Sequence, residues 1–488
     1  MSKVRQSLQM ALQLHQAQRL EDAERMYREI LAADPNFADA WHLLGLVELQ
    51  TGRQGPALAN IERAISLRPW FVYYNNLGAL HGSMGRMPEA EAAYRESLRL
   101  NPTCAATHSQ LSLPLRRQGR LDEAQTSLDE ALRLDANDAD AHLNLGVIHR
   151  LRGELDQAEA CYEAALRIEP ENAAAQLSRA LFWLLRGDFA RGWPAYEWRW
   201  RSATGPRHPP FVQPRWDGSA LAGKTILLHD EQGLGDAIQF IRYARLVRER
   251  GATRVVLRCH RSLVGLLSRS AGVDCALAQG DALPPFDVHS PLMSLPATFR
   301  TSLSNIPAET AYLSADPTRV DDWRRRLAAD RLVRVGLFWR GNRDHHEDVF
   351  RSIPLDYFAP LFEVPGCSFY SLQKDAAGEL ATIAGSRFPI IDLSDQLTDF
   401  HETAALTANL DLVIGCDSAP AHLAGALGVP IWLALPAAPD WRWLLEREDS
   451  PWYPTMRLFR QQRLGDWVPV FARAAAELRS LVAARRTD

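Results

Sequence analysis

The spacing of hydrophobic residues changes near residue 200. Before that point, apolar positions recur with the spacing of amphipathic helices, inside a longer repeat of 33 or 34 residues. One position of the repeat holds alanine, and a bulky residue follows it one helical turn later on the same face. The alanines are Ala23, Ala57, Ala90, Ala124 and Ala158, and the bulky residues are Tyr27, Ile61, Tyr94, Leu128 and Tyr162. We therefore expect stacked helix pairs, in which small residues allow close approach and large residues fill the next gap.

Turn residues mark the limits of these units. Proline closes four of them and glycine recurs in the first helix of three, at Pro35, Pro69, Pro102, Pro170, Gly45, Gly78 and Gly146. Period and pattern together resemble the tetratricopeptide repeat over residues 4–171. The resemblance implies an α solenoid of about five repeats over residues 1–171, with a concave face.

A concave solenoid face is typical of protein or peptide binding, with an architectural or oligomerising role as the alternative. Asn76 and Asn144 lie near the first helices of their repeats and are candidates for binding the backbone of an acceptor peptide. The alternative is that both side chains simply face water.

A sixth unit starts near Ala173 and then departs from the pattern. It becomes rich in aromatic residues, with Trp193, Tyr196, Trp198 and Trp200, and a linker with four prolines follows at 203–217. Aromatic residues at the end of a solenoid favour a cap that docks onto the next domain, although a surface for the acceptor is the alternative. Residues 172–221 are therefore interpreted as a divergent capping repeat and linker.

From residue 222 onward, short apolar runs alternate with helical patterns, which predicts α/β architecture. A first doubly wound, Rossmann-like domain is expected over 222–330, with strands at 225–229, 254–259 and about 286–289, and a helix at 261–270. A second is expected over 331–488, with strands at 333–339, 367–372, 389–392, 412–416 and 431–435, and helices at 355–361, 376–384, 400–409 and 468–484. Facing carboxyl edges of two such sheets form a cleft, where open α/β sheets bind their ligands.

The turn after the first of these strands reads Gly233-Leu234-Gly235-Asp236. The glycines allow a tight turn, and Asp236 can aim a carboxylate into the cleft or, alternatively, only cap its helix. The stretch lacks the third glycine of the dinucleotide fingerprint G-x-G-x-x-G. It therefore does not predict a dinucleotide site.

The stretch 411–436, DLVIGCDSAPAHLAGALGVPIWLALP, predicts a buried strand, a tight loop, a short helix and another strand. Pro420 suits the first turn of that helix. A helix N-terminus at the end of a parallel strand favours an anionic ligand, for which phosphate is the natural guest. In the alternative, Asp417 only caps the helix and His422 only fills a turn.

Composition narrows the range of partners. The formal net charge of the 488 residues is −4, which gives no long-range attraction to nucleic acid. Apolar runs fall short of a membrane span, so we expect a cytoplasmic protein without one. The six cysteines are far apart and are expected to be free thiols. His345, His346, Glu347 and Asp348 crowd one loop, but no metal site is expected there.

Four motifs in order resemble the heptosyltransferase-type glycosyltransferases over about 222–488: GLGDAIQF, GLFWRGN with RSIPL, SLQK, and DSAPAHLAGALGVP. The resemblance implies the two-domain glycosyltransferase-B (GT-B) fold and an inverting reaction without metal. It implies that Asp236 is the general base, and that Arg351, where the family has lysine, pairs with phosphate. Gly233, Gly235, Asn342, Gln373, Lys374, Asp417, Ser418 and His422 complete the implied nucleotide-sugar site.

A later segment at 436–461 carries Trp441, Arg442, Trp443, Trp452 and Tyr453. We expect it to wedge the final helix, with contact to sugar or acceptor as the alternative. The combined hypothesis is a repeat-bearing glycosyltransferase that transfers a sugar from a nucleotide-sugar donor to a protein recruited by the repeats, with no cofactor. The alternatives are an enzyme that builds lipopolysaccharide or another glycan, with the repeats assembling partners, and a non-catalytic scaffold.

Overall fold

The computed structural model describes residues 3–203, 205–374, 376, 378–380 and 388–485. These residues form two compact units. The first holds residues up to His149 together with 155–170, and the second holds 150–154 together with the chain from Glu171 onward. Each unit is described by itself.

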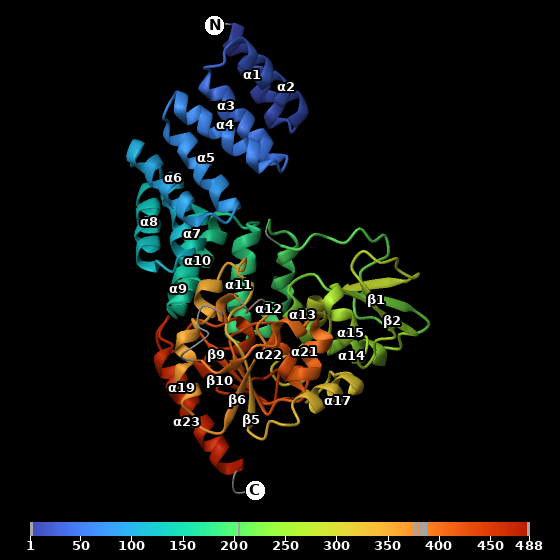
Figure 1. Cartoon of the computed structure of the whole chain (residues 1–488). Coiled ribbons are helices and arrows are strands. Elements are labelled where there is room, and N and C mark those ends of the chain that lie inside the picture. The colour runs from blue at the N-terminus through green and yellow to red at the C-terminus, as the bar shows by residue number, and fades with distance from the viewer. Residues whose placement is uncertain (1–2, 204, 375, 377, 381–387, 486–488) are drawn as a thin grey trace. The chain divides into compact units, whose positions relative to one another are not determined.

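The first unit is a solenoid of antiparallel helix pairs joined by short turns (Figure 1). Its helices are α1 (Lys3–Gln16), α2 (Leu20–Ala33), α3 (Ala38–Gln50), α4 (Gln54–Leu67), α5 (Phe71–Ser83), α6 (Met87–Leu100), α7 (Ala105–Arg117), α8 (Leu121–Leu134), α9 (Ala139–Leu151) and α10 (Leu155–Ile168). The predicted α solenoid is confirmed.

Small and large side chains interlock between neighbouring helices as the repeat pattern predicts. The five repeat alanines are fully buried, and so are their bulky partners apart from Tyr94, which is 5% exposed. A methyl group on Gly78 would lie 2.7 Å from the Tyr94 ring, and one on Gly146 would lie 2.7 Å from the Tyr162 ring. Glycine is therefore needed at these positions because the paired helix comes so close.

A divergent helix pair opens the second unit and packs into its core. It consists of α11 (Ala173–Leu185), α12 (Phe189–Tyr196) and the 3-10 turn η1 (Glu197–Trp200). Trp193 is buried against Phe240 and Trp441, and its Nε1 donates to the Thr301 carbonyl at 3.1 Å. The predicted docking of the aromatic cap onto the following domain is confirmed.

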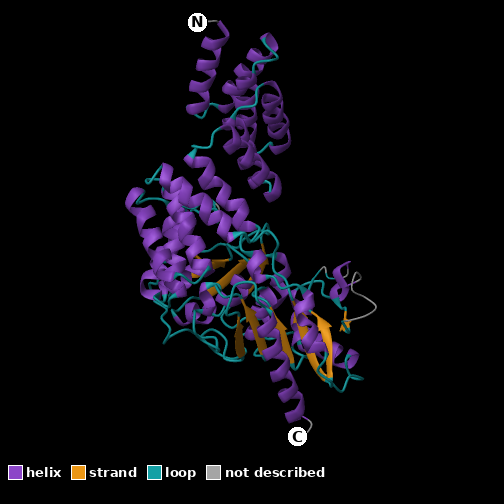
Figure 2. Cartoon of the chain, turned by 90° about the vertical axis from the view of Figure 1, so that its left-hand side faces the viewer, coloured by secondary structure: helices purple, strands orange, loops and turns teal. Residues whose placement is uncertain are grey.

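The first sheet of the second unit is parallel, in the order β3-β2-β1-β4. Its strands are β1 (Thr225–His229), β2 (Arg254–Cys259), β3 (Cys275–Ala278) and β4 (Val288–Pro291), and they appear in orange in Figure 2. Its helical segments are α13 (Leu234–Phe240), α14 (Tyr243–Glu249), η2 (Arg261–Leu263), α15 (Val264–Leu267), η3 (Leu292–Ser294) and α16 (Leu295–Thr298). The end of the linker runs alongside β4, where the Trp216 N–H donates to the His289 carbonyl at 2.8 Å.

The second sheet is also parallel, in the order β10-β9-β8-β5-β6-β7. Its strands are β5 (Val333–Phe338), β6 (Cys367–Ser371), β7 (Ile390–Ile391), β8 (Leu412–Gly415), β9 (Ile431–Leu435) and β10 (Met456–Arg460). Its helical segments are α17 (Pro317–Arg326), α18 (Asp348–Arg351), η4 (Leu355–Phe358), α19 (Ala359–Phe362), η5 (Ser394–Gln396), α21 (Phe400–Thr407), α22 (Ala419–Ala426), η6 (Trp441–Trp443) and α23 (Val468–Arg485). This is the strand order of a doubly wound nucleotide-binding sheet.

Most predicted strands are confirmed, and several elements differ from expectation. The helix expected over 355–361 is the 3-10 turn η4 followed by the short helix α19. The helix expected over 376–384 lies largely outside the described residues. The helix expected over 261–270 is a 3-10 turn followed by α15, which already ends at Leu267. The short edge strands β3 and β10 were not predicted. Strand β10 lies inside the aromatic segment, where its alternating Met-Arg-Leu-Phe-Arg pattern was masked by the tryptophans around it.

In each sheet, a helix follows a strand at the point where the strand order reverses, and these two helices face each other. The strand order reverses at β1 next to β4 in the first sheet and at β5 next to β8 in the second. Helix α13, which follows β1, packs against α22, which follows β8. The fold therefore brings together the two positions at which doubly wound sheets bind ligands.

Candidate active site

Asp236 stands in the first turn of α13. Gly233, the residue before this helix, is extended, and its N–H donates to Asp236 Oδ2 at 2.8 Å. The other carboxylate oxygen, Oδ1, accepts from Arg442 Nη2. Asp236 therefore interacts with its own helix terminus, as the capping alternative holds, and also faces a cation. Its side chain keeps 19% exposure.

Arg442 lies in η6, between β9 and β10 of the second sheet, and its side chain reaches Asp236. Its side chain is 8% exposed, its Nε donates to Gln239 Oε1 at 2.6 Å, and its Nη1 pairs with Asp440 at 2.8 Å. Each group of the guanidinium is thereby directed to a separate acceptor. Because Gln239 and Asp236 both belong to α13, Arg442 ties the segment after β9 to the helix after β1.

The two facing helices come into close contact at Gly235 and His422. A methyl group on Gly235 would lie 2.6 Å from His422 Cδ2, so no larger side chain fits without movement. Sequence reasoning singled out both residues, and the structure brings them into contact. The glycine permits the approach of the helices as well as the turn before α13.

His422 is held by aromatic neighbours on the inner side of α22. Its Nδ1 lies 2.8 Å from the Tyr453 hydroxyl, and its ring stacks on Trp443 with centroids 5.5 Å apart. Burial, with Arg442 and Arg242 nearby, holds the pKa of His422 well below its usual value, so the imidazole is neutral at neutral pH. Its Nε2 lies 4.0 Å from Asp417 Oδ1. Tyr453 thus engages Nδ1, and Nε2 is the ring nitrogen on the Asp417 side.

The start of α22 gathers several of the predicted phosphate-site residues. Ser418 precedes the helix in an extended conformation, its side chain makes no capping hydrogen bond, and proline occupies the first turn. Arg351 Nη1 donates to the Asp417 carbonyl at 3.3 Å, and Nη2 donates to the Asn342 carbonyl at 3.4 Å. Arg351, Asn342, Asp417 and Ser418 therefore meet at one end of α22.

The two acidic groups of this region have raised pKa values. Burial raises the pKa of Asp236, and Arg442 opposes the shift. Burial and the neighbouring Asp440 raise the pKa of Asp417 to about 6, against the opposing effect of Arg351. Both carboxylates are thereby more basic than a solvent-exposed aspartate.

Gln373 and Lys374 follow β6 at the same edge of the sheet. Gln373 Oε1 accepts from the Trp339 N–H at 3.2 Å and from the Arg340 N–H at 3.0 Å, which fixes the end of β5. Lys374 is exposed. A role of either residue toward the nucleotide stays a prediction.

The predicted peptide-binding asparagines lie on the solenoid. Asn76 Nδ2 is 2.7 Å from His42 Nε2 on the preceding repeat, and Asn144 is half-buried on α9. Asn75, the neighbour of Asn76, accepts from Thr107 Oγ1 at 2.9 Å. Contacts between repeats therefore orient part of this row of amides, and peptide binding stays a prediction.

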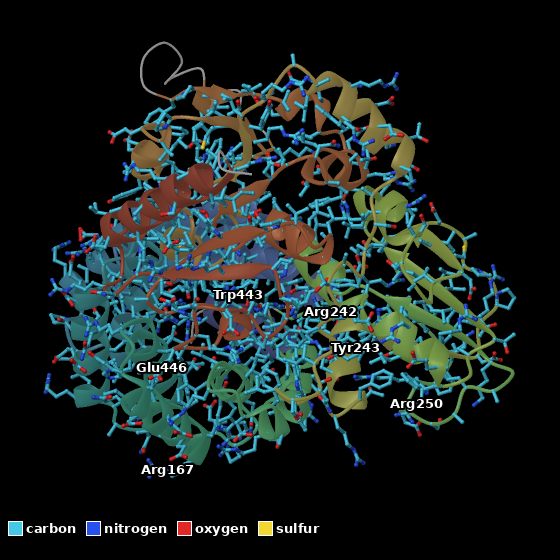
Figure 3. The ribbon with its side chains drawn as sticks, turned by 90° about the horizontal axis from the view of Figure 1, so that it is seen from below. Arg167, Arg242, Tyr243, Arg250, Trp443 and Glu446 are labelled. Carbon is cyan, nitrogen blue, oxygen red and sulfur yellow. The ribbon has the colours of Figure 1, made fainter. Side chains whose placement is uncertain are left out.

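The aromatic segment was missed as a structural connector. Trp441, Trp443, Trp452 and Tyr453 are buried. Arg242, labelled with Trp443 in Figure 3, donates to the Trp452 carbonyl at 2.7 Å, and its guanidinium lies 4.7 Å from the Tyr453 ring centroid. The segment therefore packs on the α12 and α13 region as well as on His422, a placement that the sequence alone did not indicate.

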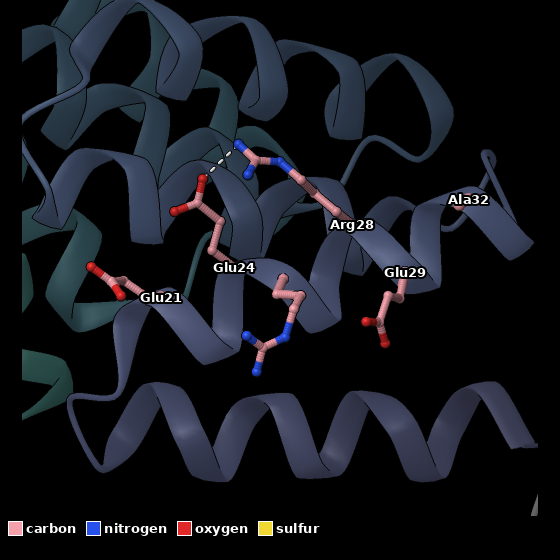
Figure 4. A pocket seen from close by; sticks show the side chains of 6 residues that line it. Glu21, Glu24, Arg28, Glu29 and Ala32 are labelled. Atoms are coloured by element: carbon pink, nitrogen blue, oxygen red, sulfur yellow. Dashed lines mark ion pairs between the residues drawn. The ribbon is translucent and has the colours of Figure 1, made fainter.

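Three further observations concern a metal site, a pocket on the solenoid and a membrane span. Among the described residues, no group of three or more His, Cys, Asp or Glu side chains is gathered closely enough to hold a metal ion. On the solenoid, a pocket of about 480 Å³ is lined by residues of α2 alone, where Glu24 pairs with Arg28 (Figure 4). No helix within the described ranges is long and apolar enough to cross a bilayer.

Family models match both parts of the chain. The tetratricopeptide repeat matches residues 8–69, 72–104, 110–168 and 152–197, and glycosyltransferase family 9 (heptosyltransferase) matches residues 373–435. The second match includes β8, Asp417 and α22. The chain thus carries tetratricopeptide repeats and, over residues 373–435, a match to glycosyltransferase family 9.

One curated relative aligns with more than half of the chain. Protein FlbA of Caulobacter vibrioides is 31% identical over 335 residues, which are 60% of this chain and 52% of FlbA. The chain therefore spans about half the length of the curated relative it matches. Solved structures that match include PilF of Pseudomonas aeruginosa (20% identity, TM-score 0.37, 41% of this chain and 90% of that chain) and a thermophilic tetratricopeptide-repeat protein of Thermus thermophilus (24% identity, TM-score 0.33, 37% and 99%).

Proposed function

We propose that the second unit is an inverting, metal-independent glycosyltransferase. In this reaction a sugar passes from a nucleotide-sugar donor to an acceptor hydroxyl, on a protein that the repeats recruit. The observation that carries the proposal is the convergence of two groups from different sheets. The Asp236 carboxylate on α13 and the N-terminal end of α22 meet where Gly235 contacts His422.

Asp236 is suited to the role of general base. A carboxylate must be ionised but basic enough to accept a hydroxyl proton as the oxygen attacks. Burial raises the pKa of Asp236, while Arg442 and the Gly233 N–H favour the ionised form and fix its orientation. Its side chain keeps 19% exposure, which an acceptor hydroxyl needs in order to approach it.

The start of α22 is suited to the leaving diphosphate. The unpaired N–H groups and the dipole of the helix favour an anion there, and Arg351 places a guanidinium beside the same turn. The His422 N–H supplies a further neutral donor. Positive potential for the developing phosphate charge thus comes from the chain itself.

The reaction balances with these groups alone. The acceptor oxygen attacks the anomeric carbon while its proton passes to Asp236. The bond between the anomeric carbon and the diphosphate oxygen breaks, and its electron pair stays on the diphosphate. A single displacement inverts the anomeric configuration.

The tetratricopeptide repeats are the feature that favours a protein, rather than a glycan, as the acceptor. Solenoids of this type present an extended concave face, and binding an acceptor there raises its local concentration for the catalytic unit. A glycan acceptor with the repeats assembling partners is the second candidate, because the family 9 match concerns heptosyltransferases. A scaffold without turnover is the third.

A thermal-shift panel of nucleoside diphosphates and nucleotide sugars tests the proposal at its base. A ligand that binds only the folded protein raises the Tm by mass action. We expect one nucleotide series to raise the Tm of the full chain and the Arg351→Ala variant to lose this shift. Failure of every nucleotide to raise the Tm, together with no turnover of any donor, would contradict the proposal. Donor binding without turnover would indicate the scaffold.

A further inference from the structure

A charged residue of the capping segment is completely buried in the α/β unit. The Arg199 side chain, in η1, has 0% exposure. Its Nη1 donates to Glu197 Oε1 at 2.8 Å, and its Nη2 donates to Ser294 Oγ at 2.6 Å and to Glu231 Oε1 at 3.0 Å. Arg199 thus joins the end of the repeat array to the ends of β1 and β4.

Glu231 stands in the loop between β1 and α13. Its side chain is 3% exposed, and Oε1 also accepts from the Met293 N–H at 3.2 Å. Its other oxygen, Oε2, is buried and has no hydrogen-bond partner among the described residues. Burial raises the pKa of Glu231 to about 7, and the neighbouring Arg199 is the cation that favours its ionised form.

The neighbouring loop residue is held by the same segment. The Tyr196 hydroxyl donates to Gln232 Oε1 at 2.9 Å. The next residue along the chain is Gly233, whose N–H bonds Asp236. The capping segment therefore holds the two residues that immediately precede the turn on which Asp236 is oriented.

A buried ion pair of this kind needs a reason beyond stability. Desolvating two charges costs as much as their attraction returns, and an apolar pair of similar volume is often as stable or more so. In some proteins such a pair serves to fix one arrangement of the chain. Here the arrangement that is fixed is the loop 230–233.

We propose that Arg199 is a positioning residue for Asp236, so that the last unit of the repeat array is a part of the catalytic centre. This inference rests on the proposed function. Arg199 holds Glu231, the Tyr196 hydroxyl holds Gln232, and together they fix Gly233 and the first turn of α13. A catalytic group displaced by about 1 Å loses up to about 100-fold in rate.

The test uses the full-length protein and measures donor turnover for Arg199→Met, Arg199→Lys, Glu231→Gln and the double variant Arg199→Met/Glu231→Gln. Arg201→Met is the matched control, because Arg201 lies on the same segment but pairs with exposed Glu171. We expect Arg199→Met to lower kcat about 10- to 100-fold with little change in the donor KM. The double variant, which removes the unpaired carboxylate as well, should recover part of this loss, and so should Arg199→Lys.

The pH profile gives a readout that a merely structural role would not move. Glu231 faces Arg199 and Asp236, while Asp236 faces Arg442, Asp440 and Arg351 in addition to the Gly233 N–H. That N–H favours the ionised carboxylate, so its loss raises the pKa of Asp236. The acidic limb of kcat/KM should therefore move to higher pH in Arg199→Met and stay in place in Arg201→Met.

The outcomes separate this inference from the proposed function. A wild-type protein that turns over no donor would contradict the proposed function. An active wild type whose Arg199→Met variant keeps kcat and the acidic limb, and loses only Tm, would overturn the positioning role alone.

Discussion

Arg442 and Asp236 form an ion pair between two segments 206 residues apart in the chain. Arg442 lies in η6, between β9 and β10 of the second sheet, and Asp236 lies in the first turn of α13, the helix that follows β1 of the first sheet. Both are largely buried, with side-chain exposures of 8% and 19%. The pair therefore sets the position of the proposed base relative to the donor side of the site.

Arg442→Met should lower the stability of the second unit strongly. Removing one partner of a buried ion pair leaves an uncompensated charge and costs about 3–5 kcal/mol. Thermal unfolding of the full chain measures this as a lower Tm. Adding Asp236→Asn to the variant should restore part of the Tm, because the two changes act on one interaction. Strict additivity of the two changes would contradict the pairing.

Arg351→Ala should weaken the binding of a nucleoside diphosphate. Loss of one charge-assisted hydrogen bond costs about 1.5–3 kcal/mol, which is about 10- to 100-fold in Kd. Calorimetric titration measures the effect, with Arg324→Ala as control because Arg324 pairs only locally with Asp321 on α17. His422→Ala should act in the same direction. Equal affinities of Arg351→Ala and Arg324→Ala would remove Arg351 from the phosphate site.

Diphosphate affinity should rise as the pH falls from 7.5 to 5.5. The pKa of Asp417 is raised to about 6, so this carboxyl is ionised at pH 7.5 and becomes largely neutral at pH 5.5. Neutralisation removes its repulsion of the phosphate oxygens, while burial holds the pKa of His422 well below its usual value and so favours its neutral form. The Asp417→Asn variant corrects for titration of the phosphate itself. It should bind more tightly than wild type at pH 7.5 and approach it at pH 5.5. A constant ratio of the two affinities across this range would contradict the assignment.

Changes on the solenoid should affect the acceptor and spare the donor. If the repeats hold the acceptor polypeptide, Asn76→Ala and Asn144→Ala raise the apparent KM for protein acceptor and leave the donor KM unchanged. A truncation that starts just before Ala173 keeps α11 and α12, which pack into the second unit, and should retain donor hydrolysis while losing transfer. Equal transfer by the truncated and full-length proteins would assign the repeats to assembly instead.

Much of the fold follows from local pattern, but the centre of the site does not. Ala57 and Ile61, or Gly78 and Tyr94, are placed by the repeat period, and the strands around Leu227 and Ile414 by continuous apolar runs. Asp236, Asp417 and His422 could be predicted because each follows a strand that ends at the cleft. The pairing of Arg442 with Asp236 could not be predicted, because Arg442 lies in a segment without helical or strand periodicity.

The pairing of Arg199 with Glu231 was also missed, because it depends on how the cap packs against the first sheet. Each stands next to more conspicuous residues, the tryptophans of the cap and the glycines of the turn, and their ion pair forms only once the cap has docked. Gln373 was predicted near the nucleotide from its motif, and the sequence did not indicate that its side-chain oxygen accepts from the N–H groups of Trp339 and Arg340, just after β5. Hydrogen bonds across a sheet edge leave no pattern along the chain.

The central claim is that Asp236 serves as the base of a single-displacement sugar transfer, and product analysis tests it most directly. Wild-type protein, Asp236→Asn and the Arg201→Met control are each given the donor found in the thermal-shift panel, with EDTA present and acceptor added, and the product anomer is read by NMR. The account predicts an inverted product from wild type and control, little effect of EDTA, and a turnover at least about 100-fold lower in Asp236→Asn with donor affinity kept. Unchanged turnover in Asp236→Asn, or a product of retained configuration, would contradict it.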